Sequence, residues 1–313
     1  MAAILQGLQG IFSVMLLIGV GFVLAKRGWF DDSSTALLAK LVTKLCLPLY
    51  MIANLTTGFT RTQLVGMSGG LVVPFLSIGI CYLVGKLVAY LLHVPRSRRG
   101  VFCSVFFTSN CIFIGLPLSL ALFGEAGVPA VMLYYIANTT TFWTIGVHDI
   151  ARDGGFQAPL WSKQTLAAVF SPPLLGFVAG VLLVFLEWPL PLPLLSVCRY
   201  LGSMTTPLAM LFIGVAISQT PWAEIRFDRE LLAALVGRFG VSPLCILLLV
   251  PFFPLPPLTA QVFTMQAAMP AMTNTSIVAK AYGGDYRYAA QITVVSVFIA
   301  ILTTPFYMWV LQG

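Results

Sequence analysis

Charged residues are scarce in this 313-residue chain: 17 are Lys or Arg and 10 are Asp or Glu, together 9% of the sequence. Soluble domains carry about a quarter charged residues, whereas 59% of this chain is hydrophobic. A helix that spans the hydrocarbon core needs about 20 apolar residues, so ten such helices would occupy about two thirds of the chain. The composition therefore predicts an integral membrane protein in contact with the lipid bilayer. It disfavours secreted enzymes, cytosolic catalysts and nucleic-acid binders, and the net charge of +7 does not indicate a nucleic-acid patch.

Groups for acid–base or metal chemistry are equally scarce. The six cysteines stand singly, mostly inside apolar runs, without the spacing of a disulfide framework or a metal site. Each Asp and Glu falls in a predicted loop or at the end of a predicted span. An intramembrane enzyme would lack acid–base groups and metal ligands at membrane depth, so we expect no enzymatic activity, no cofactor and no metal site. A proton relay or sodium site built on a buried carboxylate also finds no obvious residue, although carbonyls and amides could still bind a cation.

Apolar runs separated by polar or turn residues predict ten transmembrane helices, numbered 1 to 10 in chain order: 4–25, 33–53, 64–92, 99–123, 128–149, 165–187, 195–219, 230–251, 257–281 and 287–311. Lys and Arg in alternate connecting segments number eleven on one side and two on the other. Positive residues collect in the cytoplasm. Both termini should therefore be extracytoplasmic and the 150–164 loop cytoplasmic, in a membrane of the bacterial inner-membrane type.

Two short matches at the same five-helix offset indicate an internal repeat. Pro48-Leu49-Tyr50-Met51 in helix 2 resembles Pro207-Leu208-Ala209-Met210 in helix 7, and Phe123-Gly124-Glu125 after helix 4 resembles Tyr282-Gly283-Gly284-Asp285 after helix 9. Because five is odd, the second copy must insert upside down, which is the inverted-repeat plan of secondary transporters. The predicted fold is thus an all-α membrane protein of ten transmembrane helices. Its first repeat covers 1–150, a short cytoplasmic linker 151–164, and its second, inverted repeat 165–313.

Helices 4 and 9 contain the residues least suited to a regular helix, in Thr108-Ser109-Asn110-Cys111-Ile112-Phe113-Ile114-Gly115-Leu116-Pro117 and in Met269-Pro270-Ala271-Met272-Thr273-Asn274-Thr275-Ser276. Proline removes a backbone donor and clashes with the preceding turn, while short polar side chains can bond the freed backbone groups. Both helices should break near the bilayer midplane, exposing N–H groups that suit an anion and carbonyls that suit a cation. The alternative is a pair of kinked packing helices.

These motifs resemble the auxin efflux carrier family. The resemblance is carried by Asn110-x-x-x-x-Gly115-Leu116-Pro117 with Tyr134-Tyr135-x-x-Asn138, and by Met269-Pro270-x-x-x-Asn274 with Tyr282-Gly283-Gly284-Asp285. The short central loop is similar to that of bacterial members, the malate and malonate permeases, rather than to many plant auxin carriers. The resemblance implies a fold like that of bile-acid symporters, with an elevator-type transport domain and a scaffold domain. It also implies a small organic anion as substrate, such as malate, malonate or an auxin-like carboxylate, bound where helices 4 and 9 cross.

The predicted substrate site follows from these motifs and contains Asn110, Gly115, Pro117, Asn138, Pro270, Thr273 and Asn274. Lys44 and Arg238 lie deeper in their spans than other basic residues, so they could lend positive potential to an anion pathway or cap freed carbonyls. Two alternatives within transport remain open, a sodium-coupled organic-anion symporter of the bile-acid type and a passive channel. The sequence is compatible with a homodimer.

Overall fold

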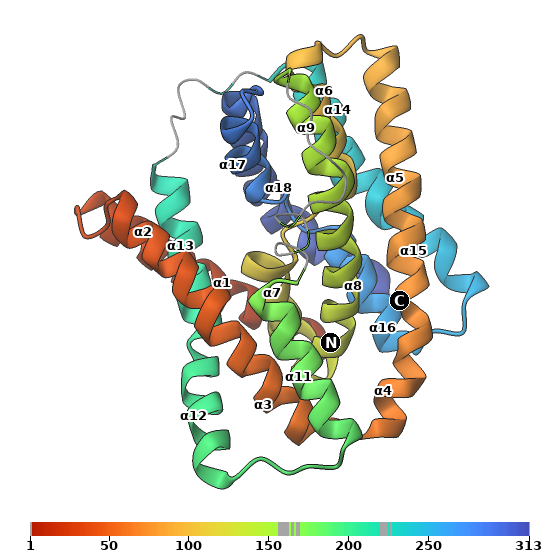
Figure 1. Cartoon of the computed structure of the whole chain (residues 1–313). Coiled ribbons are helices and arrows are strands. Elements are labelled where there is room, and N and C mark those ends of the chain that lie inside the picture. The colour runs from red at the N-terminus through yellow and green to blue at the C-terminus, as the bar shows by residue number, and fades with distance from the viewer. Residues whose placement is uncertain are drawn as a thin grey trace. The chain divides into compact units, whose positions relative to one another are not determined.

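The computed structural model describes residues 2–155, 163, 166, 170–219, 225 and 227–312. Much of the predicted linker, residues 156–162 and 164, lies outside the described part. Along the chain the helical elements are α1 (Ala2–Lys26), α2 (Asp32–Leu41), η1 (Val42–Cys46), α3 (Leu47–Gly58), α4 (Arg61–Ser68), η2 (Gly69–Leu71), α5 (Val72–Leu91), α6 (Arg96–Phe107), η3 (Cys111–Gly115), α7 (Leu116–Phe123), η4 (Glu125–Gly127), α8 (Val128–Thr141), η5 (Phe142–Gly146), α9 (Val147–Asp153), α11 (Pro172–Phe185), α12 (Leu192–Ser203), α13 (Thr205–Ser218), α14 (Arg229–Val236), η7 (Gly237–Val241), α15 (Ser242–Leu249), η8 (Val250–Phe252), α16 (Pro257–Ala267), α17 (Asn274–Ala281) and α18 (Tyr286–Gln312) (Figure 1).

The described residues form helices joined by short connections, which confirms the all-α class. Their β structure is limited to one isolated bridge. Five of the described helical stretches are long and apolar enough to cross a membrane: Ser33–Gly58, Arg61–Leu91, Leu192–Ser218, Arg229–Phe252 and Tyr286–Leu311. Shorter apolar helices cover Phe12–Lys26, Cys111–Phe123 and Pro172–Phe185. The arrangement of ten spans as two inverted repeats stays a prediction.

Proline sets a recurring local structure in these helices. The five-residue π-helical segments η1, η3 and η7 are each followed by an α-helix with proline at its second position, namely Pro48, Pro117 and Pro243. The proline ring would clash with the carbonyl four residues earlier, and a wider π turn moves that carbonyl aside. Lys44 lies in η1 and Arg238 in η7, so both basic residues occupy locally widened turns.

The chain folds into two compact units, each of which combines segments from both halves of the sequence. Unit 1 comprises Met1–Gly69, Ile112–Met132 and Phe170–Gln219. Its helices pack closely through glycine: a Cβ on Gly176 of α11 would overlap the backbone of Pro48 in α3, and one on Gly214 of α13 would overlap the backbone of α1. Small residues let membrane helices approach to backbone contact.

Unit 2 comprises Gly70–Cys111, Leu133–Val169 and Thr220–Gly313. Its core is built on α6, where Phe102 and Phe106 are buried against residues of η5, α14 and α18. At one end of the unit, Arg98 joins the starts of three helices through Asp228, Glu230 and Asp285, at 3.4, 3.0 and 3.1 Å. The broken segments of predicted helices 4 and 9 meet inside this unit.

Candidate functional site

Both predicted helix breaks are present. α6 ends at Phe107, and Thr108 is extended, with φ −113° and ψ 141°, before η3 begins at Cys111. α16 ends at Ala267 and α17 begins at Asn274. Pro270 lies inside the second gap, where its missing N–H prevents a continuous helix. Each break leaves a short non-helical segment in an otherwise apolar helix.

The two non-helical segments pair with each other. Ser109 and Ala271 form an antiparallel β-bridge, and the Asn110 N–H donates to the Pro270 carbonyl at 2.8 Å. The Asn110 side-chain amide also donates to Thr273 Oγ1 at 2.8 Å. The structure therefore brings together three of the predicted site residues, Asn110, Pro270 and Thr273.

Each break is supported by a polar side chain from a later helix, α8 for the first break and α18 for the second. Asn138 of α8 accepts the Ser109 N–H at 2.8 Å and donates its amide to the Ser109 carbonyl at 2.9 Å. On the other segment, Ser296 of α18 accepts the Ala271 N–H at 3.0 Å. Backbone groups freed inside a membrane helix need such partners. The sequence analysis selected Asn138 but missed Ser296. The only sequence feature that could have indicated Ser296 is its position as a polar residue within the last apolar span.

Arg238 joins the ends of the two half-helices that precede the breaks. Its side chain is fully buried and donates to the Val105 carbonyl near the end of α6 at 3.3 Å. It also donates to the carbonyl of Ala267, the last residue of α16, and to Ser242 Oγ. Helix C-termini carry partial negative charge and unpaired carbonyls. These contacts correspond to the capping alternative for Arg238, applied to both broken helices at once.

Five buried hydroxyl groups of unit 2 have no hydrogen-bond partner among the described residues, and two of them lie beside the helix breaks. These two belong to Thr139, next to Asn138 in α8, and to Thr275, in the first turn of α17 after the break. Both residues are nearly or fully buried. A buried polar group without a partner is costly, so each hydroxyl marks a position that a polar ligand would stabilise.

The other predicted site residues are distributed between the units. Gly115 ends η3 and Pro117 lies in α7, both buried and both in unit 1. Asn274 is the first residue of α17 and is partly buried in unit 2. Lys44 also belongs to unit 1, where its side chain is exposed. Their expected roles at the substrate site stay predictions.

One charged pair was not foreseen from the sequence. Asp149, expected at the end of helix 5, lies within α9 because this helix continues to Asp153. It is buried, forms an ion pair with Lys86 at 2.8 Å and accepts a hydrogen bond from the Tyr82 hydroxyl at 3.0 Å. Lys86, in the last turns of α5, is thus held by a carboxylate.

A second unforeseen polar cluster lies in unit 1. The Glu125 carboxylate accepts hydrogen bonds from the Tyr50 hydroxyl and the Asn54 amide. These residues line a cavity of about 560 Å³ together with Arg199. Glu125 is exposed, as expected for its position after helix 4. Within the described chain, no group of three or more His, Cys, Asp or Glu residues is placed to hold a metal ion.

Long apolar helices, together with two paired helix breaks, are features of an integral membrane transporter. Residues 7–308 match the membrane transport protein family, and the chain belongs to this family, that of the auxin efflux carriers. A protein named "Uncharacterized transporter" from Methanothermobacter thermautotrophicus is 23% identical over 97% of this chain and 98% of its own length. "Uncharacterized transporter MJ1031" from Methanocaldococcus jannaschii is 24% identical over 95% and 96%. A "Putative malonate transporter" from Rhizobium meliloti is 24% identical over 65% of this chain and 64% of its own length.

Proposed function

We propose that this protein is a secondary carrier, and not an enzyme, that moves a small organic anion such as malonate or malate. The observation that carries the proposal is the pairing of two broken helices, Ser109 against Ala271, beside the buried Arg238. The relative named as a malonate transporter supports the substrate class. In this proposal the site is shaped by Asn110, Gly115, Pro117, Asn138, Pro270, Thr273 and Asn274, and Lys44 lies on the anion pathway.

The contacts of Arg238 favour an anion over a cation. Its guanidinium bonds neutral oxygens, and no described Asp or Glu forms an ion pair with it. A buried charge without a counter-ion is costly, so a bound carboxylate would be stabilised nearby. The same guanidinium donates hydrogen bonds to carbonyls at the ends of both half-helices, so these oxygens are not free to bind a cation. We therefore favour a sodium-independent carrier over the sodium-coupled alternative.

In this proposal, the hydroxyl groups of Thr139 and Thr275 donate hydrogen bonds to the bound carboxylate. Each hydroxyl is buried without a partner in the described chain. A carboxylate accepts such hydrogen bonds well because its charge strengthens them. The first turn of α17, beginning at Asn274, adds the partial positive charge of a helix N-terminus.

Transport is proposed to follow an elevator mechanism. Unit 2 holds both helix breaks and would carry the substrate, whereas unit 1 would serve as the scaffold. The two inverted halves, 1–150 and 165–313, would each contribute helices to both units. The membrane is taken to be of the bacterial inner-membrane type because of the loop charge asymmetry.

Uptake by proteoliposomes tests the function directly. Purified protein reconstituted into liposomes should take up radiolabelled malonate saturably, and unlabelled malate should compete with this uptake. The rate of uptake should be the same in sodium and potassium buffers. A strict sodium requirement would establish the symporter alternative instead. Non-saturable conductance would establish a channel, and failure of every carboxylate in a thermal-shift panel to bind would contradict the proposal.

The substitution Thr275→Val tests the site, because valine keeps the shape of threonine but removes the unpartnered hydroxyl. We expect the melting temperature without ligand to be unchanged or higher. Malonate affinity should fall roughly tenfold to hundredfold, the effect of one hydrogen bond to a charged ligand. Thr304→Val is the matched control, since that buried hydroxyl bonds the Ala300 carbonyl inside α18 at 2.6 Å. Unchanged affinity in Thr275→Val would contradict this site assignment without refuting transport.

A further inference from the structure

A second polar cavity lies in unit 2, apart from the helix breaks, at the end where α5 finishes, α6 begins and α9 finishes (Figure 1). Its volume is about 300 Å³. Four basic side chains line it, from Lys86, Arg96, Arg99 and Arg152. The sequence places this end on the cytoplasmic side, where Lys and Arg collect.

The charges in this cavity do not cancel. The carboxylate of Asp149 forms an ion pair with Lys86 at 2.8 Å, and the carboxylate of Asp153 accepts a hydrogen bond from the Gly100 N–H. Arg99 donates to the Val94 carbonyl at 3.0 and 3.3 Å, a contact that leaves its charge uncompensated. With Arg96 and Arg152, which are exposed, three guanidinium groups face one remaining carboxylate.

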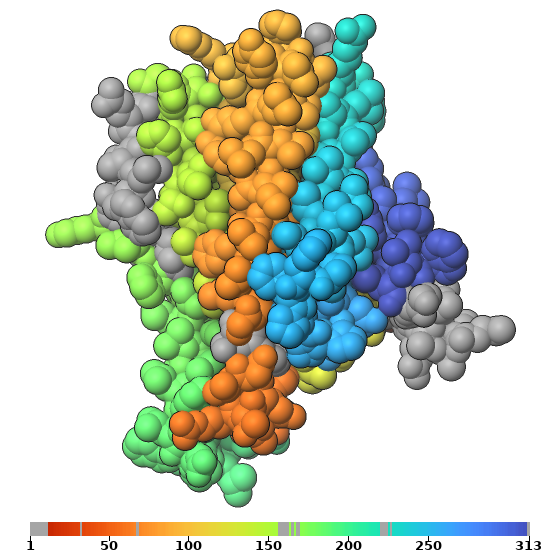
Figure 2. Space-filling view, turned by 90° about the vertical axis from the view of Figure 1, so that its right-hand side faces the viewer, coloured from red at the N-terminus to blue at the C-terminus, as the bar shows by residue number. Residues whose placement is uncertain are grey.

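An apolar surface leads directly from this cavity along α5. Leu83, Leu87, Tyr90 and Leu91 follow helical spacing and are each more than half exposed. Tyr90 also lines the cavity, so the polar pocket and the apolar stripe share a residue. Figure 2 shows α5 in orange as a continuous column of exposed side chains along this face.

We propose that this cavity binds the phosphate group of an anionic phospholipid, with the acyl chains lying along the exposed face of α5. Arginine guanidinium groups bond phosphate oxygens in a fork-like geometry. Basic pockets between transmembrane helices at the cytoplasmic face are suited to acidic lipid headgroups. A headgroup there would join α5, α6 and α9, and it would stabilise unit 2 independently of the transported acid.

Lipid titration tests this assignment. The probe is phosphatidylglycerol at increasing mole fraction in phosphatidylcholine nanodiscs, with bound lipid counted by native mass spectrometry and the melting temperature recorded in parallel. Wild-type protein should retain phosphatidylglycerol preferentially and melt at a higher temperature as its fraction rises. The double variant R96A/R152A should bind it about tenfold to thirtyfold more weakly, since each basic residue near an acidic membrane surface contributes severalfold to affinity.

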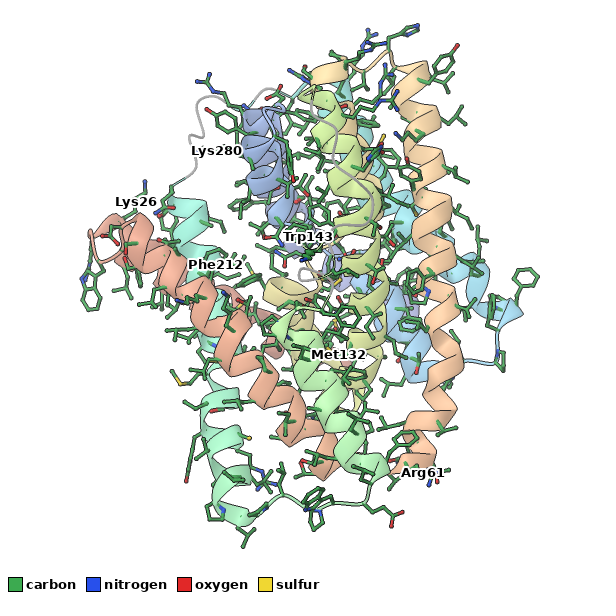
Figure 3. All side chains as sticks on the ribbon, in the orientation of Figure 1. Lys26, Arg61, Met132, Trp143, Phe212 and Lys280 are labelled. Atoms are coloured by element: carbon green, nitrogen blue, oxygen red, sulfur yellow. The ribbon has the colours of Figure 1, made fainter. Side chains whose placement is uncertain are left out.

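The control variant R229A/K280A removes two exposed positive charges from the same end of unit 2 but outside the cavity. Figure 3 labels Lys280 at the end of α17. This control should bind phosphatidylglycerol like wild type, and R96A/R152A should melt like wild type in pure phosphatidylcholine. Equal lipid binding by both double variants would overturn the proposal. So would equal stabilisation of wild type by inorganic phosphate in phosphatidylcholine alone, if R96A/R152A abolished that stabilisation, because the cavity would then be a site for a soluble anion.

Discussion

Asp153 is a single residue whose environment predicts a pH effect. It lies at the end of α9, beyond predicted helix 5, and burial, with a smaller contribution from the charge of Asp149, raises its pKa from 3.8 to about 6. Between pH about 4 and 6, the folded protein therefore retains a proton on Asp153 that the unfolded chain has released. Stability from this group is complete below pH about 4 and is lost as pH rises through 6.

The substitution Asp153→Asn should remove that loss, because an amide oxygen still accepts the Gly100 N–H but does not ionise. Melting temperatures in a non-ionic detergent should therefore fall from pH 4 to 7 less in Asp153→Asn than in wild type. Asp31→Asn is the control: hydrogen bonds from Ser34 lower the pKa of Asp31, so its contribution to stability is complete above pH about 4 and its loss should leave the slope from pH 4 to 7 nearly unchanged. Identical pH profiles for wild type and Asp153→Asn would contradict the prediction.

Arg238 acts at the scale of elements, because one guanidinium joins the ends of α6 and α16. Arg238→Ala leaves the Val105 and Ala267 carbonyls without that partner. Each buried carbonyl left unpaired costs about 1–3 kcal/mol, so the free energy of unfolding should fall by several kcal/mol. Arg238→Lys should lose less, since an ammonium keeps the charge but cannot reproduce the planar fork.

Melting temperature and malonate affinity of purified Arg238 variants check this prediction, with Arg229→Ala as the exposed control on α14. A fully stable Arg238→Ala protein would show that the two helix ends do not depend on this contact.

The helix breaks could be predicted from sequence because their causes are local. Pro270 and the short polar run around Ser109 cannot continue a regular helix, whatever surrounds them. The partners of the breaks could not be predicted in the same way. Ser296 and the Lys86–Asp149 pair depend on which helices pack together, and no local pattern contains that information. The π turn η5 also lacks the proline that follows η1, η3 and η7, so nothing in its sequence indicates it.

At the scale of the whole molecule, compact units and predicted repeats are different divisions of one chain. The predicted repeats, 1–150 and 165–313, are a hypothesis about symmetry in the sequence, whereas the units describe packing and take segments from both halves. The chain passes from unit 2 to unit 1 between Cys111 and Ile112, directly after the break at 108–110. Sequence similarity between halves could not indicate where packing would divide them.

The predicted topology gives a test at this scale. Alkaline phosphatase fused after residue 313 should be active in a bacterial host, because an odd number of crossings separates the cytoplasmic 150–164 loop from the C-terminus. Green fluorescent protein at the same site should stay dark when exported by the general secretory route. The reverse pattern would refute either the ten spans or their orientation.

The placement of Arg238 bears on how membrane voltage acts on the cycle. The guanidinium belongs to the same unit as the paired breaks, so in an elevator cycle it travels with the bound acid. A unit loaded with a dianion such as malonate would then carry one net negative charge at this site, whereas the empty unit would return with its fixed positive charge. Moving one elementary charge through 100 mV changes the free energy by about 2.3 kcal/mol. Because the two charges are opposite and the two crossings run in opposite directions, the membrane potential would act in the same sense on the loaded crossing and on the return of the empty carrier.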